Sequence, residues 1–315
     1  MERKKIVMAK TAFIFPGQGA QYIGMAQDFY ETYEESKEIF DKAKEILNID
    51  IAEICFTENE QLNITEYTQA AILTVCIAIL RKVESMGVKA DVTAGLSLGE
   101  YPALVASKVF TFEDALKVVR QRGILMQEAV PVGLGAMAAV LGLDEKLTSK
   151  ICEETPGIVT VANYNCPGQI VISGEAKAVE EAGIRIKEAG AKRVLPLNVS
   201  GPFHSPMLEG AGKELGKVLD SVTIHRPVIP YVDNTNAQFV TEGEGIKNLL
   251  VDQVSSSVMW QQSVEQMIAN GVDTFIEIGP GKTLTSFVKK ISKECITINI
   301  EKISDLEKLQ EVPKC

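Results

Sequence analysis

The strongest constraint on this chain is the pentapeptide GLSLG at residues 95–99. An apolar stretch at residues 92–94 leads into it and a helix-compatible stretch at 98–107 follows it, which predicts strand, sharp turn and helix. A serine at such a turn has its hydroxyl pushed away from the backbone, and the flanking glycines leave room where side chains would clash. The amide of Leu98 would then lie at the positive end of a helix, facing the group that Ser97 attacks. The pattern predicts a nucleophile elbow, and the alternative is a glycine-rich turn without chemistry.

Net charge and hydrophobicity limit the partners that this chain can bind. With 315 residues and a net charge of -10, the chain is long enough for an α/β domain carrying a smaller one. Long-range repulsion from this charge argues against nucleic acid and against an anionic membrane surface as partners. The longest uncharged apolar run, residues 70–80, is far shorter than the roughly 20 residues of a membrane span. We therefore expect no nucleic acid and no membrane partner, and a buried helix at residues 70–80 that ends near Gly87.

The cysteines indicate neither a metal site nor disulfides. The six cysteines, which include Cys315, contain no C-x-x-C pair and have no histidine nearby at ligand spacing, so we expect no metal. Free thiols fit a reducing cytosol. The basic start at residues 3–5 does not lead into a signal peptide, because Lys10 interrupts the apolar run that follows. A cytoplasmic location is the expectation.

Two glycine-rich loops resemble nucleotide-binding motifs and fail at defined positions. The loop PGQGAQ at residues 16–21 follows a predicted strand at 12–15, but a dinucleotide fingerprint needs a small residue where Tyr22 stands. The sequence GPGKT at 279–283 lacks the first glycine of a phosphate loop, because that position is Ile276. The loop at 16–21 can still present backbone N–H groups, including that of Gln18, to a reacting oxygen.

One arginine lies on the predicted core-facing side of a helix. The sequence TFED at residues 111–114 resembles a capping box and predicts a helix that runs toward Val130. Its apolar face, at i, i+3, i+4 spacing, is formed by Ala115, Val118, Val119, Arg122 and Met126. Arg122 is then either a structural residue, paired with an internal carboxylate, or an anion receptor.

The order of predicted elements divides the chain into two domains. Residues 135–199 read as β-α-β-β-α-β, the order of a ferredoxin-like unit, and lie between two α/β segments. Strands that alternate with helices on either side imply a mainly parallel sheet covered on both faces. The predicted fold class is α/β, with a parallel-sheet, hydrolase-like main domain at 1–133 and 203–315. The ferredoxin-like α+β subdomain is inserted at 134–202.

A serine nucleophile needs a base, and imidazole is the usual one because its pKa lies near 6.5. The chain has two histidines. His225 lies in a strand-like approach to a proline, where packing or solvent exposure is the simpler role. His204 lies in a short loop between Pro202 and Pro206 and follows the nucleophile in the chain, as enzymes with this elbow require. We favour His204 as the base.

Several separate motifs together resemble a known family. In chain order they are GQGAQ at 17–21, GLSLGEY at 95–101, QRG at 121–123, NYN at 163–165, GPFHSP at 201–206 and IGPG at 278–281. The same motifs occur in this order in malonyl-CoA:acyl carrier protein transacylases, and the resemblance covers almost the whole chain. The match is closest to the free-standing bacterial enzymes of fatty acid synthesis.

The resemblance implies a role for each candidate residue. Ser97 would be acylated, His204 would be its base, and Arg122 would bind the malonyl carboxylate. The amides of Gln18 and Leu98 would form the oxyanion hole. Family members orient the histidine with a main-chain carbonyl from a later loop, and Gln253 matches that position. One departure is Leu96, which stands where the family usually has a histidine before the nucleophile.

The resemblance further implies ping-pong transfer of malonyl from malonyl-CoA, through Ser97, to the phosphopantetheine thiol of holo acyl carrier protein. No metal or redox cofactor is needed for this reaction. Three alternatives share some of the same motifs: a free-standing acyltransferase that serves a polyketide synthase, a serine hydrolase acting on acyl thioesters, and a non-catalytic carrier-binding module. A buried Arg122 on the acyl side favours transfer over hydrolysis.

Overall fold

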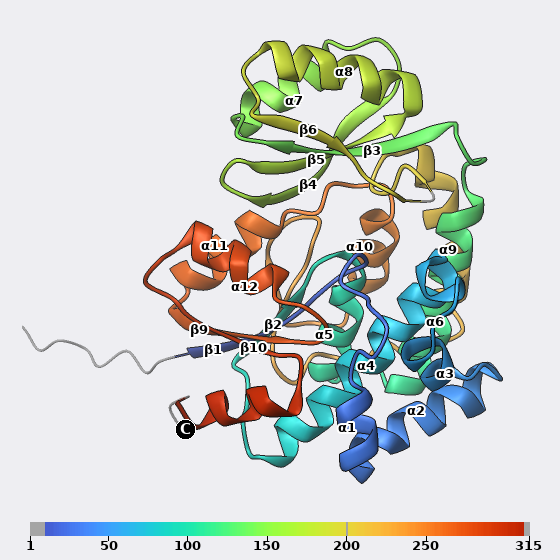
Figure 1. Cartoon of the computed structure of the whole chain (residues 1–315), viewed down its shortest axis with the longest axis vertical. Coiled ribbons are helices and arrows are strands. Elements are labelled where there is room, and N and C mark those ends of the chain that lie inside the picture. Colours follow the sequence, from blue (N-terminus) through green and yellow to red (C-terminus); the bar gives the residue numbers. More distant parts are fainter. Residues whose placement is uncertain (1–9, 200, 312–315) are drawn as a thin grey trace, which may run out of the picture.

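The computed structural model describes residues 10–199 and 201–311. Cys315 and the basic residues at positions 3–5 lie outside this part of the chain. Two β-sheets organise the molecule, a larger one in the main body and a smaller one above it (Figure 1).

The larger sheet is mostly parallel, as the alternation of strands and helices predicts. Its order is β10-β9-β1-β2-β7-β8, and every neighbouring pair is parallel except β7 with β8. The strands are β1 (Lys10–Phe15), β2 (Val92–Gly95), β7 (Tyr231–Val232), β8 (Phe239–Val240), β9 (Val272–Ile278) and β10 (Ile296–Ile300). Because β1, β2 and β9 are adjacent and parallel, the loops that follow them meet at one edge of the sheet.

Helices cover both faces of this sheet (Figure 1). Side chains of β1 alternate between the two cores: Phe13 and Phe15 join one, Ala12 and Ile14 the other. The first core is covered by α1 (Gln27–Thr32), α2 (Glu34–Leu47), α3 (Ile51–Phe56), α4 (Thr65–Ser85), α5 (Glu100–Ala106), α6 (Phe112–Glu128), α9 (Glu209–Leu219) and α10 (Ile246–Gln253). The second is covered by α11 (Trp260–Ala269) and α12 (Thr283–Ile291).

Two helices follow the sequence signals that predict them. The apolar run at residues 70–80 lies inside α4 and is wholly buried there, and Gly87 follows the end of the helix with a positive φ of 82°. Helix α6 begins at Phe112, where the Thr111 hydroxyl oxygen accepts a hydrogen bond from the amide of Asp114 at 3.0 Å. Within the helices that the structure describes, none is both long and apolar enough to cross a bilayer.

The smaller sheet is antiparallel and has the order β4-β5-β3-β6. It contains β3 (Gly135–Leu141), β4 (Val159–Cys166), β5 (Gln169–Glu175) and β6 (Arg193–Pro196), with α7 (Glu145–Glu153) and α8 (Ala176–Glu188) packed on it through a separate apolar core. Each element lies where the β-α-β-β-α-β pattern predicts it, within a few residues.

Other segments differ from the sequence-based expectations. The helix expected at 207–219 begins as a 3-10 turn, Pro206–Leu208, before α9 at Glu209–Leu219. The strand expected at 229–232 is only Tyr231–Val232. Helices α1 to α3, strands β8 and β10, and the 3-10 helix Ile303–Glu311 were not predicted; most of these elements are short, although the 14-residue α2 has a clear amphipathic pattern.

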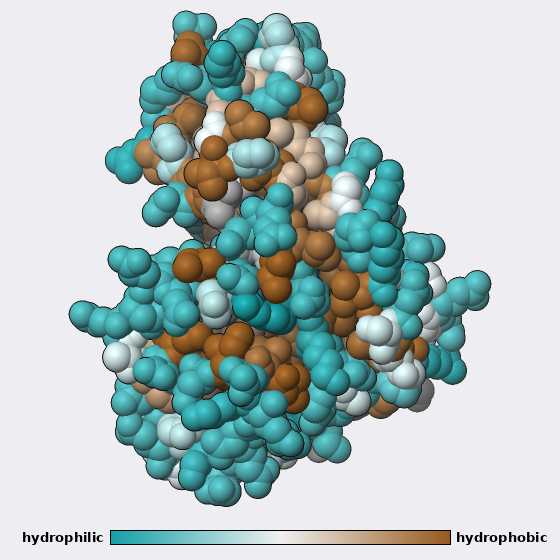
Figure 2. Space-filling view, turned by 90° about the vertical axis from the view of Figure 1, so that its right-hand side faces the viewer, coloured by the Kyte–Doolittle hydropathy of each residue, from teal (hydrophilic) through white to brown (hydrophobic). Residues whose placement is uncertain are grey.

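The smaller unit also carries exposed hydrophobic surface. Figure 2 shows one face of the molecule, with hydrophobic side chains gathered on the upper unit above a hollow. Ile184 and Leu195 are 56% and 44% exposed, and they line a groove of about 710 Å³ between α8 and β6. Met137 lines both this groove and the cavity at Ser97.

Candidate active site

The turn after β2 places Ser97 in a strained backbone conformation. Ser97 has a φ of +54°, a left-handed value that a side chain disfavours. The chain is packed tightly around it: a Cβ on Gly95 would lie 1.8 Å from the carbonyl oxygen of Gly99, and one on Gly99 would lie 2.1 Å from that of Phe15. The 3-10 turn Ser97–Gly99 then leads directly into α5. This geometry is that of the elbow that the motif predicts.

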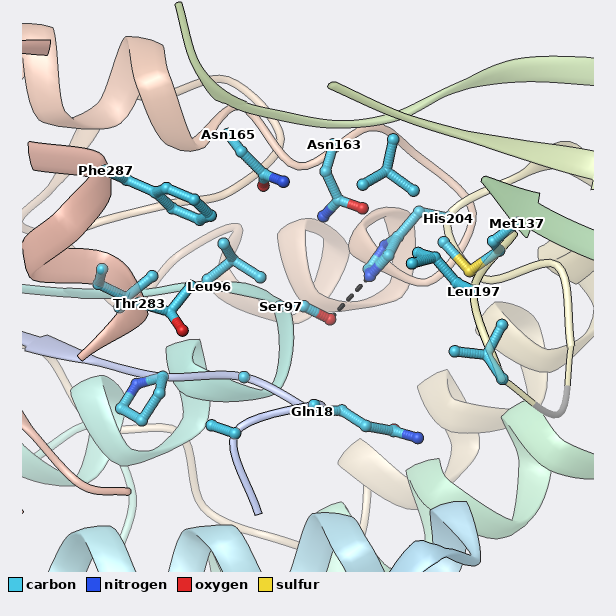
Figure 3. Close-up of a pocket in the computed structure, with 17 residues that line it drawn as sticks. Gln18, Leu96, Ser97, Met137, Asn163, Asn165, Leu197, His204, Thr283 and Phe287 are labelled. Carbon is cyan, nitrogen blue, oxygen red and sulfur yellow. Dashed lines mark hydrogen bonds between the residues drawn. The ribbon is translucent and has the colours of Figure 1, made fainter. Parts of the chain in front are cut away.

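His204 lies within hydrogen-bond distance of Ser97. The Ser97 Oγ is 2.7 Å from the His204 Nε2, and Figure 3 shows the two side chains pointing toward each other across the cavity. The His204 Nδ1 is 2.8 Å from the main-chain carbonyl oxygen of Gln253. Because a carbonyl only accepts, Nδ1 carries the proton and Nε2 is free to accept the Ser97 hydroxyl hydrogen. The other histidine, His225, is exposed.

Burial keeps the imidazole neutral. Loss of solvent, followed by the nearby positive charge of Arg122, lowers the pKa of His204 from its ordinary 6.5 to about 4, against the opposing effect of the Gln253 carbonyl. At neutral pH the ring is therefore unprotonated, which is the state that a general base requires.

Arg122 lies beside Ser97 and is completely buried. One terminal nitrogen donates to the Gln69 Oε1 at 2.7 Å, and the other donates to the Gln253 Oε1 at 2.9 Å and to the Ser97 Oγ at 3.2 Å. All three acceptors are neutral, and among the described residues no ion pair includes Arg122. A buried guanidinium next to the nucleophile, without a carboxylate of its own, is suited to a carboxylate brought by a ligand.

The loop after β1 brings Gln18 to the same cavity. Its side chain extends away from Ser97 (Figure 3) and its Nε2 donates to the Thr65 Oγ1 at 3.1 Å. The loop approaches the elbow closely, since a Cβ on Gly17 would lie 2.4 Å from the carbonyl oxygen of Leu96. Gln18 is among the residues that line the cavity. Leu98, the residue after the nucleophile, is buried.

Asn234 is a site residue that the sequence did not reveal. Its Oδ1 accepts from the Ser97 amide at 2.6 Å and its Nδ2 donates to the Gly95 carbonyl at 2.7 Å, so it bridges both ends of the strained turn. Because the Ser97 main-chain N–H already donates to Asn234, the next main-chain N–H along the elbow is that of Leu98. Asn234 follows β7, the strand beside β2, and knowledge of the strand order would have found it.

The cavity lies between the two sheets and measures about 240 Å³. The main body contributes Gln18, Ser97 and Phe287, and the antiparallel sheet contributes Met137 and Asn163 (Figure 3). Its lining is mostly apolar, with Leu96 among the residues that face it. The nucleophile thus lies in a mostly apolar cavity with a few polar groups, an arrangement that suits a partly polar ligand arm.

The chain is similar in sequence and in structure to known acyl transferases. The profile of the acyl transferase domain matches residues 12–314. The chain is 47% identical over 305 residues to a malonyl CoA-acyl carrier protein transacylase of Bacillus subtilis, which covers 95% of this chain and 96% of that protein. A crystal structure of the transacylase of that name from Clostridium perfringens has a TM-score of 0.93 at 47% identity and covers 96% of each chain. A malonyl-transacylase solved in complex with a type II polyketide synthase acyl-carrier protein also has a TM-score of 0.93, at 39% identity, covering 96% of this chain and 99% of that one.

Proposed function

The chain belongs to the acyl transferase domain family, together with the malonyl CoA-acyl carrier protein transacylases, and from this we propose how its own residues perform the reaction. It is an acyltransferase that moves the malonyl group from malonyl-CoA to an acyl carrier protein. The observation that carries the mechanism is the contact of 2.7 Å between Ser97 Oγ and His204 Nε2, beside a buried Arg122 that has no ion-pair partner among the described residues.

Acylation begins when the neutral His204 takes the Ser97 proton at Nε2 and the Ser97 Oγ attacks the thioester carbonyl. The amides of Gln18 and Leu98 stabilise the oxyanion, and each such donor is worth about 3 kcal/mol. When the tetrahedral intermediate collapses, the C–S bond breaks and the coenzyme A sulfur leaves with the proton from His204. The carbonyl of Gln253 holds the imidazolium through Nδ1 during this step.

Transfer to the carrier repeats these events with the roles exchanged. The phosphopantetheine thiol gives its proton to His204, its sulfur attacks the malonyl ester, and the released Ser97 oxygen takes the proton back. Arg122 binds the malonyl carboxylate in both half-reactions, because its terminal nitrogen lies 3.2 Å from the Ser97 Oγ. An acyl group without that carboxylate leaves the guanidinium unpaired, which we expect to cost about 2–5 kcal/mol.

The division into domains is part of this proposal. The main domain at 1–133 and 203–315, with a hydrolase-like parallel sheet, would carry Ser97 and His204, and the unit at 134–202 would cover the substrate arm. The β-α-β-β-α-β order and the spatial order β4-β5-β3-β6 support a ferredoxin-like subdomain. The free thiols of five described cysteines support a cytoplasmic location.

The pathway is fatty acid synthesis in this proposal, with a free-standing polyketide acyltransferase as the alternative. This alternative is supported by the relative that was solved in complex with a type II polyketide synthase acyl-carrier protein. Comparing kcat/KM for the fatty acid carrier and for a polyketide carrier of the same cell would separate the two.

Intact mass spectrometry tests the chemistry directly. Malonyl-CoA alone should add one malonyl group, and peptide mapping should place it on Ser97. Label on a cysteine, or label that persists in Ser97→Ala, would overturn the proposed dyad. Coenzyme A release that continues over many turnovers without carrier protein, beyond the one equivalent that acylation of Ser97 liberates, would instead favour the serine hydrolase.

A further inference from the structure

A buried carboxyl group lies one side chain away from Arg122. Glu100 is completely buried in the first turn of α5, three residues after the nucleophile. Its Oε2 accepts from the Gln253 Nε2 at 2.7 Å and from the Asn234 amide at 3.2 Å, whereas its Oε1 has no partner in the described part of the chain. A buried carboxyl with one oxygen unsatisfied is costly to keep, so its presence calls for an explanation.

Gln253 connects this carboxyl group to Arg122. Its Oε1 accepts from Arg122 at 2.9 Å, while its Nε2 donates to Glu100 at 2.7 Å and to the Ser97 carbonyl at 3.1 Å. An amide has one accepting and one donating end, so its orientation is fixed only where each end meets the opposite kind of group. If the amide turned over, its NH₂ group would face the guanidinium, donor against donor.

We propose that Glu100 is a positioning residue for malonyl recognition: it fixes the orientation of the Gln253 side-chain amide, and Gln253 in turn holds Arg122 ready for the malonyl carboxylate. The inference rests on the proposed function, in which Arg122 is the carboxylate receptor. Glu100 touches neither the acyl group nor His204.

The effect of Glu100 falls on acyl selection more than on base catalysis. His204 is held by the main-chain carbonyl of Gln253, which stays in α10 whichever way the side-chain amide points. Arg122, in contrast, contacts the side-chain oxygen of Gln253. Loss of the Glu100 carboxyl therefore acts first on the guanidinium, whereas the main-chain contact that orients His204 remains.

The surroundings indicate that Glu100 acts as a neutral acid. Burial, and then the nearby Asp233, raise the pKa of Glu100 to about 8, against weaker opposing effects from Gln253, Asn234 and Arg122. Tyr101 and Tyr231 also face Glu100, and burial raises the pKa of both. A neutral carboxyl has one carbonyl oxygen, which matches the two bonds accepted by Oε2, and glutamine reproduces this acceptor.

The test compares Glu100→Ala and Glu100→Gln with wild type, using acylation kcat/KM for malonyl-CoA and for acetyl-CoA. We expect Glu100→Ala to lower the malonyl value about 10- to 100-fold and the acetyl value by less than about 3-fold. Glu100→Gln should recover the malonyl value to within about 5-fold, because its carbonyl oxygen accepts the same two bonds. Above pH 8, ionised Glu100 repels the malonyl carboxylate, so the malonyl-to-acetyl ratio should fall in wild type and stay level in Glu100→Gln.

Glu277→Gln and Glu277→Ala serve as matched controls, because Glu277 is also completely buried but bonds to amides of α12 instead of Gln253. The malonyl-to-acetyl ratio should not change in either control. Equal losses of malonyl and acetyl transfer in Glu100→Ala, or a Glu100→Gln variant no better than Glu100→Ala, overturn the inference. If malonyl-CoA does not malonylate Ser97 in the wild-type enzyme, the proposed function is wrong. Intact mass spectrometry shows this before any variant is measured.

Discussion

Two strand-turn-helix connections leave the same edge of the large sheet, one after β2 and one after β9, on either side of β1. Each has a buried glutamate. Glu277 lies near the end of β9, where its Oε1 accepts from the Leu284 amide at 3.0 Å and its Oε2 accepts from the Thr285 amide at 2.7 Å, at the start of α12. After β2, only one oxygen of Glu100, Oε2, accepts hydrogen bonds from the described residues. In the same turn Ser97 has a left-handed φ of +54°.

The comparison separates a buried carboxyl group that stabilises the fold from one that serves the site. The β9 turn uses both carboxylate oxygens to satisfy the unpaired amides of a helix N-terminus, so its polar groups serve the fold. Around the β2 turn, Glu100 Oε1 and Arg122 Nε of α6 have no partners among the described residues, and Ser97 has a strained backbone. Changes at the β2 turn should therefore lower activity, and changes at the β9 turn should lower stability.

Removal of the nucleophile or its base should have the largest effect. Ser97→Ala and His204→Ala should each lower the acylation rate by about 10⁴-fold or more, because neither group acts without the other. Their melting temperatures should stay close to that of wild type. The measurement is single-turnover malonylation followed by intact mass, and a His204→Ala variant that acylates within tenfold of wild type would contradict the assignment.

Arg122→Ala should have the next largest effect, on selection. Malonyl transfer should fall about 100- to 1000-fold while acetyl transfer stays level or rises, since the unpaired guanidinium no longer penalises a neutral acyl group. Arg122→Lys should recover little, because a point charge cannot make the two-pronged contact. The experiment is kcat/KM for both thioesters beside a thermal melt. A large drop in melting temperature with an unchanged malonyl-to-acetyl ratio would make Arg122 a structural residue.

At the β9 turn, Glu277→Ala should lower the free energy of unfolding by about 2–4 kcal/mol, because two buried amides lose their acceptors. Denaturant titration measures this. Burial raises the pKa of Glu277 from 4.5 to about 7, so the folded state binds more protons than the unfolded state between these values. Stability should therefore fall as pH rises from 4.5 to 7, and Glu277→Gln should remove this decline. A slope that is the same in both proteins would refute the expectation.

The smallest effect concerns carrier docking, which we expect to rely on a few exposed basic residues near the cleft. These are Lys192, Arg193, Lys282, Lys289 and Lys290. Reversing their charges should raise KM for an acidic carrier about 3- to 10-fold and leave acylation by malonyl-CoA unchanged. Lys117→Glu, on exposed surface of α6, is the control. An unchanged KM in the reversed variants would show that the patch is wrong.

Local signals in the sequence predicted the parts of the site that depend on neighbouring residues. The elbow at Ser97, the capped start of α6 and the inward position of Arg122 follow from turn chemistry and helical period. The use of a main-chain carbonyl at Gln253 came from the family resemblance, because any residue has a carbonyl.

The residues that were missed act through distant contacts. Asn234 reaches Ser97 because β7 lies beside β2, and Gln69 reaches Arg122 because α4 packs on α6. Neither residue has a local pattern that marks it. The role of Glu100 was also hidden, although it belongs to the quoted motif, since its partner Gln253 is far away in the chain.

The close approach at Gly95 and Gly99 has a consequence for how such a site can change. Any Cβ at either position overlaps a main-chain atom, so a saturation library should return glycine alone among active clones. The elbow therefore requires residues without a Cβ at both positions. No single substitution at Gly95 or Gly99 is expected to give an active intermediate from which a different turn could evolve. Residues that line the cavity around Ser97 can change one at a time, whereas the segment 95–99 can be moved to another protein only as a whole.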